Sequence, residues 1–318
     1  MINRTTKVFV AGHRGVVGAA IVCALEARGC EQVVVRAREQ LDLSDRPAVE
    51  AFFAAERPEV VIMAAAKVGG IAANMAAPVE FLVENLRIQD NVLLASQKFG
   101  VAKTAFLGSS CIYPREAPQP MREQYFMHGP LEPTNESYAV AKIAGIRLAQ
   151  ALHEQYGTNV ICPMPCNVYG RGDHFELERA HVVSALVRRF AEAVTLHSPS
   201  VTLWGTGSAR REFIFTDDLA DAVLFLLENF DSPDIINVGT GVDFSIKELA
   251  ERIARVVGFT GEIEWDSSKP DGMPRKLLDV SRLHALGWRH SVDIDEGLLI
   301  VADDFARRYP ISHGVASR

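Results

Sequence analysis

The stretch "KVFVAGHRGVVG", residues 7–18, joins a short apolar run to three evenly spaced glycines. The apolar run predicts a buried strand, and residues 16–28 predict a helix directly after it. Glycines at such a junction let backbone N–H groups and the helix N-terminus come close to a pyrophosphate. The spacing is G-x-x-G-x-x-G rather than the commoner G-x-G-x-x-G, so a tight turn without a ligand is the alternative. The members of this predicted phosphate-binding turn are Gly12, His13, Arg14, Gly15, Val16, Val17 and Gly18.

The rest of the first half alternates short apolar runs with longer amphipathic segments. This alternation predicts an α/β fold with a doubly wound, Rossmann-type parallel sheet. Asp45 lies shortly before Pro47, so we expect it to cap the helix that begins there. The remaining strands are predicted at residues 32–36, 60–66, 103–109 and 159–165, and the helices at 46–56, 79–99 and 137–156.

The regular alternation loosens after about residue 168. We therefore expect a dinucleotide-binding domain over residues 1–168, with returning segments from about 210–240. The remainder, residues 169–318, is expected to form mainly a smaller, partly interleaved C-terminal substrate lobe. In this part, helices are predicted at 181–196, 217–229 and 246–257, and a strand at 201–204.

Composition excludes several classes of function. The 318 residues are 48% hydrophobic and 23% charged, as in ordinary soluble globular proteins. The net charge is −7 and the basic residues are scattered, so we expect no nucleic-acid partner. No apolar stretch reaches the roughly 18 residues of a membrane span, and the N-terminus lacks the form of a secretory signal. Five cysteines without a C-x-x-C pair favour a reducing, cytoplasmic location, and nine scattered histidines predict no metal site.

Basic residues follow the second predicted strand, where an acidic residue would bind the ribose 2′-hydroxyl of NAD. That strand runs into Arg36 and Arg38, and Arg14 lies inside the glycine-rich turn. Guanidinium groups bind phosphate with bidentate geometry and would pair with a 2′-phosphate. The alternative is that these arginines are solvated surface residues. We expect NADP(H) as the cofactor, with Arg38 among its ligands.

The segment "NESYAVAKIAG" places Tyr138 and Lys142 four residues apart, on nearly one face of a predicted helix. A free phenol has a pKa of about 10, and a nearby ammonium group lowers that pKa toward neutrality. A surface Tyr–Lys pair is the alternative. Ser109 lies at the end of a predicted strand upstream, and the combination predicts a group that transfers a proton.

The segment "FLGSSCIYP" places the thiol of Cys111 directly after two serine hydroxyls, at the end of a predicted strand. A lone cysteine is most often a buried packing residue. The rest of the sequence decides whether it has a second use.

Seven segments together resemble one enzyme family. The chain resembles the extended short-chain dehydrogenase/reductases that act on nucleotide sugars, and among them the GDP-L-fucose synthases, or GDP-4-keto-6-deoxy-mannose epimerase-reductases. The segments lie in consistent order between residues 11 and 280. They are "AGHRGVVG", "AAAKVGGI", "GSSCIYP", "LEPTNESYAVAKIAG", "RAHVVSALVRRF", "WGTGSARREF" and "KPDGMPRKLLDV".

The resemblance implies a catalytic role for five residues. Ser109, Tyr138 and Lys142 would form the reductive centre, in which hydride from NADPH reaches the C4 ketone while Tyr138 donates a proton. Cys111 and His181 would act as acid and base at C3 and C5, whose hydrogens the ketone acidifies. A thiol and an imidazole both titrate near neutral pH. The alternative for His181 is a capping or core histidine.

The resemblance also implies cofactor and substrate contacts, and GDP-linked keto-deoxy sugars as substrates. A homodimer is expected, in which helices 79–99 and 137–156 of two subunits form a four-helix bundle. Asn85 and Asn167 are expected near the substrate or at strand ends. Further cofactor contacts are Lys142, Pro165, Cys166, Asn167, Val168 and His181, and the substrate contacts are Arg189, Trp204, Arg211 and Asp279.

The chain departs from the family pattern in one loop. Residues 171–180 read "RGDHFELERA", with His174 where an asparagine is usual, and Cys166 stands where a threonine is usual. Because this loop is expected to border the sugar, a heptose, a dideoxy sugar or another deoxyhexose stays open as substrate. A redox-neutral epimerase with tightly bound NAD stays open as well, and so does a non-catalytic dinucleotide sensor.

Overall fold

The computed structural model describes residues 2–176, 180–269 and 271–310. Its main sheet has six parallel strands in the order β2-β1-β3-β4-β5-β9. This confirms the predicted α/β class with a Rossmann-type sheet. The strands are β1 (Val8–Ala11), β2 (Val33–Val34), β3 (Val60–Met63), β4 (Lys103–Phe106), β5 (Val160–Pro165) and β9 (Ile235–Val238).

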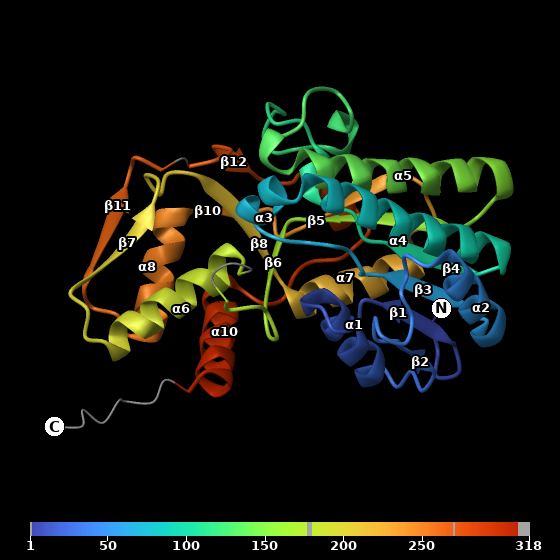
Figure 1. Ribbon diagram of the computed structural model, residues 1–318, viewed down its shortest axis with the longest axis horizontal. Helices are drawn as coiled ribbons and strands as arrows, with labels where there is room; N and C mark the ends of the chain where they lie inside the picture. The colour runs from blue at the N-terminus through green and yellow to red at the C-terminus, as the bar shows by residue number, and fades with distance from the viewer. Residues whose placement is uncertain (1, 177–179, 270, 311–318) are drawn as a thin grey trace.

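Helices cover both faces of this sheet. Helices α4 and α5 pack side by side above it, while α1 and α7 pack together below it (Figure 1). The side chain of Asp45 accepts a hydrogen bond from the N–H of Ala48, so it caps α2 as predicted. The bounds are α1 (Val16–Ala27), α2 (Arg46–Glu56), α4 (Pro78–Lys98), α5 (Glu136–Tyr156) and α7 (Thr216–Asn229).

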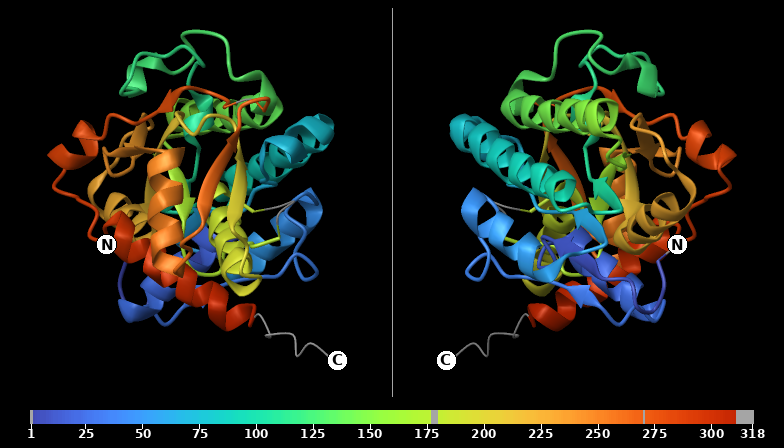
Figure 2. Two further views of the ribbon diagram at one scale, coloured as in Figure 1. Left: turned by 90° about the vertical axis from the view of Figure 1, so that its left-hand side faces the viewer. Right: turned by 90° about the vertical axis from the view of Figure 1, so that its right-hand side faces the viewer.

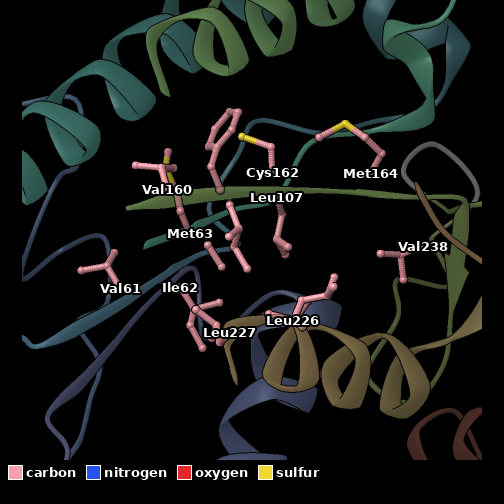
Figure 3. Packing of buried hydrophobic residues seen from close by; sticks show 14 of the residues in the cluster. Val61, Ile62, Met63, Leu107, Val160, Cys162, Met164, Leu226, Leu227 and Val238 are labelled. Carbon is pink, nitrogen blue, oxygen red and sulfur yellow. The ribbon is translucent and has the colours of Figure 1, made fainter. Parts of the chain in front are cut away.

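Both faces of the central strands are buried, which explains their continuous apolar sequences. Every residue of β1, β3, β5 and β9 is buried. Figure 3 shows Cys162 and Met164 of β5 on the side of α5, and Leu226 and Leu227 of α7 on the opposite side. The core therefore lies in two layers, one on each side of the sheet.

A second cluster of buried side chains lies in the C-terminal part, built around Tyr169, Phe190 and Phe215. The predicted helices 181–196, 217–229 and 246–257 are each present to within one residue. Helix α7 and strand β9 lie within the expected returning segment 210–240 and contribute side chains to the core around the six-stranded sheet. The predicted boundary at residue 168 stays a prediction. The elements of this part are β6 (Asn167–Tyr169), α6 (Val182–Thr195), β7 (Ser200–Trp204), β8 (Arg210–Phe215), β10 (Asp243–Ser245), α8 (Ile246–Val257), β11 (Glu262–Asp266), β12 (Arg275–Lys276), α9 (Ser281–Ala285) and α10 (Ile294–Arg308).

Short elements connect the two parts near the carboxyl ends of the strands. The connection between β4 and α5 rises above α5 and forms the outermost loop of the molecule (Figures 1 and 2). A backbone bridge from Met121 to Leu278 joins this connection to the segment after β12. The short helices are α3 (Ile71–Ala76), η1 (Ser110–Ile112), η2 (Glu123–Tyr125) and η3 (Pro133–Asn135).

Candidate active site

The glycine-rich turn follows β1 directly and packs tightly. Gly12 has a φ of +89°, and a Cβ there would lie 2.6 Å from the backbone nitrogen of Ala65. A Cβ on Gly18 would lie 2.1 Å from the carbonyl oxygen of Gly12. Gly15 is the N-cap of α1, and no side chain caps that helix. The N–H groups of the first turn therefore face outward from the carboxyl edge of the sheet, available to an anion.

The surroundings of this turn fit a dinucleotide phosphate. Nδ1 of His13 is buried and has no hydrogen-bond partner in the described part of the chain. Arg14 lies 3.2 Å from Glu39 in an exposed pair, and exposed Arg38 lies 3.9 Å from Glu84. Such exposed pairs contribute little stability, so these guanidinium groups can exchange partners for a phosphate.

Arg36 has a different role from the one considered from the sequence. Its guanidinium donates to Glu56 at 2.5 Å and lies 5.5 Å from the centre of the Phe52 ring. Arg36 therefore fastens the end of β2 to α2. Arg14 and Arg38 remain as the exposed basic residues near the turn.

The segment from Pro165 to Val168 lies at the same edge of the sheet, because β1 and β5 run parallel. The N–H of Cys166 donates to the carbonyl of Val238 at 3.0 Å. The side chain of Asn167 donates to the carbonyl of Glu212 at 2.7 Å. These bonds fix the segment at the junction between β5 and β6.

Ser109, Tyr138 and Lys142 lie close together, and their predicted catalytic roles stay predictions. Ser109 ends the segment after β4 and forms a side-chain hydrogen bond with Tyr138. The Lys142 ammonium lies 6.0 Å from the Tyr138 ring centre and donates to the carbonyl of Leu107 at 2.8 Å. Burial lowers the pKa of Lys142 to about 8. The hydroxyl, the phenol and the amine thus share one site, in which Lys142 is buried and Ser109 and Tyr138 are partly buried.

The pKa of Tyr138 moves in the direction opposite to the one expected. Burial raises it, the charge of Cys111 raises it further, and the bond from Ser109 offsets only part of this. Lys142 does not contribute to this shift; its ammonium donates to the Leu107 carbonyl and lies 4.8 Å from the centre of the Phe106 ring. Tyr138 therefore keeps its proton at neutral pH, as a proton donor requires.

Cys111 lies in η1, in contact with this group. Its Sγ accepts hydrogen bonds from Nδ2 of Asn135 at 3.1 Å and from Nζ of Lys276 at 3.4 Å. Its N–H donates to the Ser109 hydroxyl at 3.2 Å. Burial raises the pKa of the thiol, but the charge of Lys276 and the hydrogen bonds outweigh burial, so that the pKa falls below its usual value. The sulfur is therefore activated toward its thiolate form.

The sequence analysis missed Lys276 and Asn135 as site residues. Both lie inside segments quoted for the family resemblance, but nothing in their local pattern pairs them with Cys111. Lys276 reaches the thiol because β12 pairs in parallel with β8, and that contact joins residues far apart in the chain.

We predict that Lys276→Met raises the pKa of the Cys111 thiol, because the nearest positive charge is lost. The rise of the Cys111 alkylation rate with pH should then shift to higher pH. The rate with iodoacetamide is measured by peptide mass spectrometry at a series of pH values. Lys247→Met, which removes an exposed lysine on α8, is the matched control and should leave the profile unchanged. An unchanged profile in Lys276→Met would contradict the assignment.

His181 lies apart from this cluster. It occupies the N-cap of α6 without capping the helix through its side chain. It lines a hollow of about 380 Å³ together with Lys67, Phe81 and His174. Within residues 2–176, 180–269 and 271–310, no hydrogen bond or ion pair joins His181 to Cys111 or Tyr138. The predicted pairing of Cys111 with His181 stays a prediction, and residues 177–179 of the divergent loop lie outside the described part.

The predicted substrate contacts on α6 and β7 are oriented differently from their neighbours. Arg189 donates to the carbonyl of Thr202 at 3.5 Å, while the adjacent Arg188 turns toward Glu192 at 2.6 Å. Trp204 is 66% exposed, and Nζ of Lys269 lies 5.7 Å from its ring centre. Arg189 and Trp204 therefore stay predicted substrate residues.

Two other predicted residues already hold protein partners. Burial lowers the pKa of Arg211, while the charges of Glu132 and Asp271 oppose that effect. Asp279 binds Ser281 at the start of α9 and pairs with Arg122 at 3.2 Å. Their roles toward a substrate stay predictions.

Asn85 is buried and bound on both sides to the backbone. Its side chain accepts from the N–H of Lys67 at 2.8 Å and donates to the carbonyls of Lys67 and Phe81. It thereby fixes the loop after β3 to α4, and this loop lines the hollow next to His181.

Comparison with known proteins gives one consistent family. A profile of the NAD dependent epimerase/dehydratase family matches residues 8–239. The chain is 55% identical over 300 residues to a probable GDP-L-fucose synthase 1 of Oryza sativa subsp. japonica, covering 94% of this chain and 92% of the relative. It is 50% identical over 301 residues to the GDP-L-fucose synthase of Escherichia coli (strain K12), covering 92% and 94%.

A solved structure agrees with this result. It is a GDP-D-glycero-L-gluco-heptose synthase from Campylobacter jejuni, crystallised in the presence of NADPH. The two chains are 36% identical, with a TM-score of 0.88 over 96% of this chain and 99% of the other. These similarities confirm the resemblance inferred from the sequence.

Proposed function

This chain belongs to the NAD dependent epimerase/dehydratase family, and from that premise we propose that it is an NADP(H)-dependent epimerase and reductase of a GDP-4-keto-6-deoxy-hexose. Its product is GDP-L-fucose or a close relative. The observation that carries the proposal is the contact between the activated thiol of Cys111 and the group formed by Ser109 and Tyr138. The relatives named GDP-L-fucose synthase support the choice of substrate.

Reduction uses the proton that Tyr138 retains. When bound, NADPH would supply a hydride to C4 of the sugar. As the C4–O double bond becomes a single bond, the Tyr138 hydroxyl donates its proton to the oxygen, and Ser109 donates a hydrogen bond to the same oxygen. Lys142, which lies 6.0 Å from the centre of the Tyr138 ring, would hold the cofactor ribose. The glycine-rich turn and Arg38 hold the phosphates.

Epimerisation uses the same ketone. The carbonyl at C4 stabilises a carbanion at C3 or C5 as an enolate, so a base can remove the proton from either carbon. Lys276 and Asn135 donate to Sγ of Cys111, which supports the thiolate as the group that exchanges a proton with the sugar on one face. His181 exchanges a proton on the opposite face, and the C–H bond re-forms there with inverted configuration. Arg189 and Arg211 bind the diphosphate, and Trp204 and Asp279 make further contacts with the substrate.

A second candidate keeps the fold and changes the sugar. The Campylobacter jejuni relative is named for a GDP-heptose product, and His174 of the divergent loop lines the hollow beside His181. A GDP-keto-heptose would then replace the deoxyhexose. A redox-neutral epimerase with tightly bound NAD would show no net consumption of NADPH.

The proposed function is tested by NMR of the product formed from GDP-4-keto-6-deoxy-mannose and NADPH. We expect stoichiometric oxidation of NADPH and the spectrum of GDP-L-fucose. A product reduced at C4 but not inverted would limit the activity to reduction. Inversion without loss of NADPH would favour the redox-neutral alternative, and binding without turnover would favour a sensor.

We also propose a homodimer through α4 and α5 and a cytoplasmic location. Val79 on α4 and Val140 on α5 are exposed apolar side chains on neighbouring helices, which supports a four-helix bundle between two subunits. A mass from light scattering equal to one chain would contradict the dimer.

The five cysteines are free, which suits a reducing compartment. Among the described residues, no helix is long and apolar enough to cross a membrane.

A further inference from the structure

The divergent loop between β6 and α6 contains a carboxylate that faces the His181 imidazole. Oδ1 of Asp173 lies 3.6 Å from Nδ1 of His181. Asp173 is 1% exposed, whereas the His181 side chain is 49% exposed and borders the hollow. We propose that Asp173 is a positioning residue that keeps Nδ1 of His181 protonated and leaves Nε2 for the substrate. The proton transfer between the imidazole and a substrate rests on the proposed function, whereas the orientation of the ring does not.

The Asp173 carboxylate is fixed by bonds that do not involve the imidazole. The hydroxyl of fully buried Ser184 donates to Oδ2, and the N–H of His174 donates to Oδ1 at 2.8 Å. A buried carboxylate needs such donors, because burial without them is costly. Ser184 of α6 binds Oδ2 of Asp173. The other oxygen, Oδ1, therefore faces Nδ1 of His181, the N-cap residue of the same helix.

The loop backbone is fastened as well. The Arg308 guanidinium, in the last turn of α10, donates to the Asp173 carbonyl at 2.9 Å and to Asp304 at 3.0 Å. Asp304 in turn accepts from the N–H of Gly172 at 3.0 Å. Arg308 also lies 5.4 Å from the centre of the Phe175 ring. Asp173 is therefore anchored from two helices, and its position does not depend on His181.

The charges around His181 agree with this arrangement. Asp173 raises the pKa of His181, and burial opposes that rise. Burial raises the pKa of Asp173, but His181 and Ser184 outweigh it, so the carboxyl stays ionised. Among the described residues, the other charged or titratable groups that line the hollow are Lys67, which pairs with Glu84 at 2.7 Å, and His174, which lies 3.6 Å from Glu176.

A hydrogen bond from Nδ1 decides which ring nitrogen carries the proton in a neutral histidine. The separation of 3.6 Å is longer than an ordinary hydrogen bond, and such contacts in enzymes often tighten when substrate binds. With Nδ1–H directed at Asp173, Nε2 is the nitrogen that gives or takes the proton at the sugar. The carboxylate also stabilises the imidazolium, so His181 remains a proton donor to higher pH.

Asp173→Asn tests this role. We expect the titration midpoint of His181, followed by NMR of its ring nitrogens, to fall, and its signal is assigned by comparison with His181→Gln. With substrate, the high-pH limb of the solvent-exchange profile should shift to lower pH. The exchange rate near neutral pH should fall by about 10- to 100-fold, part of what acid–base catalysis contributes. Asp218→Asn is the matched control, since Asp218 is another buried carboxylate bound by a serine hydroxyl and backbone N–H groups.

An unchanged His181 midpoint in Asp173→Asn would overturn the proposal, as would an equal shift in Asp218→Asn. If Asp173→Asn does not fold, the wild-type protein decides: neutral His181 should carry its proton on Nδ1, and a predominant Nε2–H form would overturn the proposal. These NMR measurements need no substrate. A correct His181 tautomer with no turnover of the GDP-sugar would thus reject the proposed function alone.

Discussion

Cys111→Ala should abolish the incorporation of solvent deuterium into the sugar while leaving NADPH binding intact. In the proposed mechanism the thiolate that Lys276 and Asn135 stabilise exchanges a proton with the sugar, and an alanine methyl group can neither take nor return a proton. Loss of one acid–base group costs on the order of 10²- to 10⁴-fold in rate. The measurement is mass spectrometry of the recovered sugar nucleotide after incubation in D₂O, with NADPH binding followed by fluorescence.

The control for this variant is Cys23→Ala, which removes an exposed thiol on α1 and should exchange at the wild-type rate. Cys111→Ser separates size from acidity, because a hydroxyl fits the same space but does not ionise near neutral pH. We expect Cys111→Ser to be as slow as Cys111→Ala. Wild-type exchange in the alanine variant would remove Cys111 from the mechanism.

The first half of the fold could be predicted from the sequence because its signals are local. Strands buried on both faces are short apolar runs, as in residues 60–63 and 160–165, each of which follows a polar residue. The glycine-rich turn could be predicted because the backbone itself requires those residues: Gly12 has a positive φ, and Gly18 leaves no space for a Cβ. Each of these constraints lies within a few residues in sequence.

Other elements could not be predicted because their stability comes from distant partners. Strand β9 has four residues and is stabilised by pairing with β5. Strand β8 begins with charged residues, which do not indicate a strand, and it is stabilised by pairing with β6, β10 and β12. Short strands of this kind have little intrinsic preference, because pairing and burial decide them.

The same distinction holds for the site. Tyr138 and Lys142 lie one helical turn apart, so spacing alone places them together. Lys276 meets Cys111 only through the packing of β12, and Asp173 meets His181 only because α10 and α6 fix the loop. The family resemblance supplied Cys111 and His181, but it did not supply the charged residues that set their pKa values.

Tyr138→Phe should lower the rate of NADPH oxidation by about 10²- to 10⁴-fold, because the ring is kept and only the donated proton is lost. Burial keeps the pKa of Tyr138 high, so the wild-type phenol stays protonated across neutral pH, and this loss should be the same from pH 6 to 8. Deuterium exchange should fall less than reduction, since Ser109 still donates to the oxygen at C4 and Cys111 still removes the proton. The absorbance of NADPH and the isotope content of the sugar, measured in one sample, give both rates.

Tyr156→Phe is the matched control, because Tyr156 is an exposed tyrosine in the last turn of the same helix. Its two rates should equal those of the wild type. The comparison between Tyr138→Phe and Cys111→Ala then separates the two half-reactions: the first variant exchanges without reducing, and the second does not exchange at all. If both variants lost exchange and reduction in equal proportion, the phenol and the thiol would serve one common step, and the assignment of separate roles would be wrong.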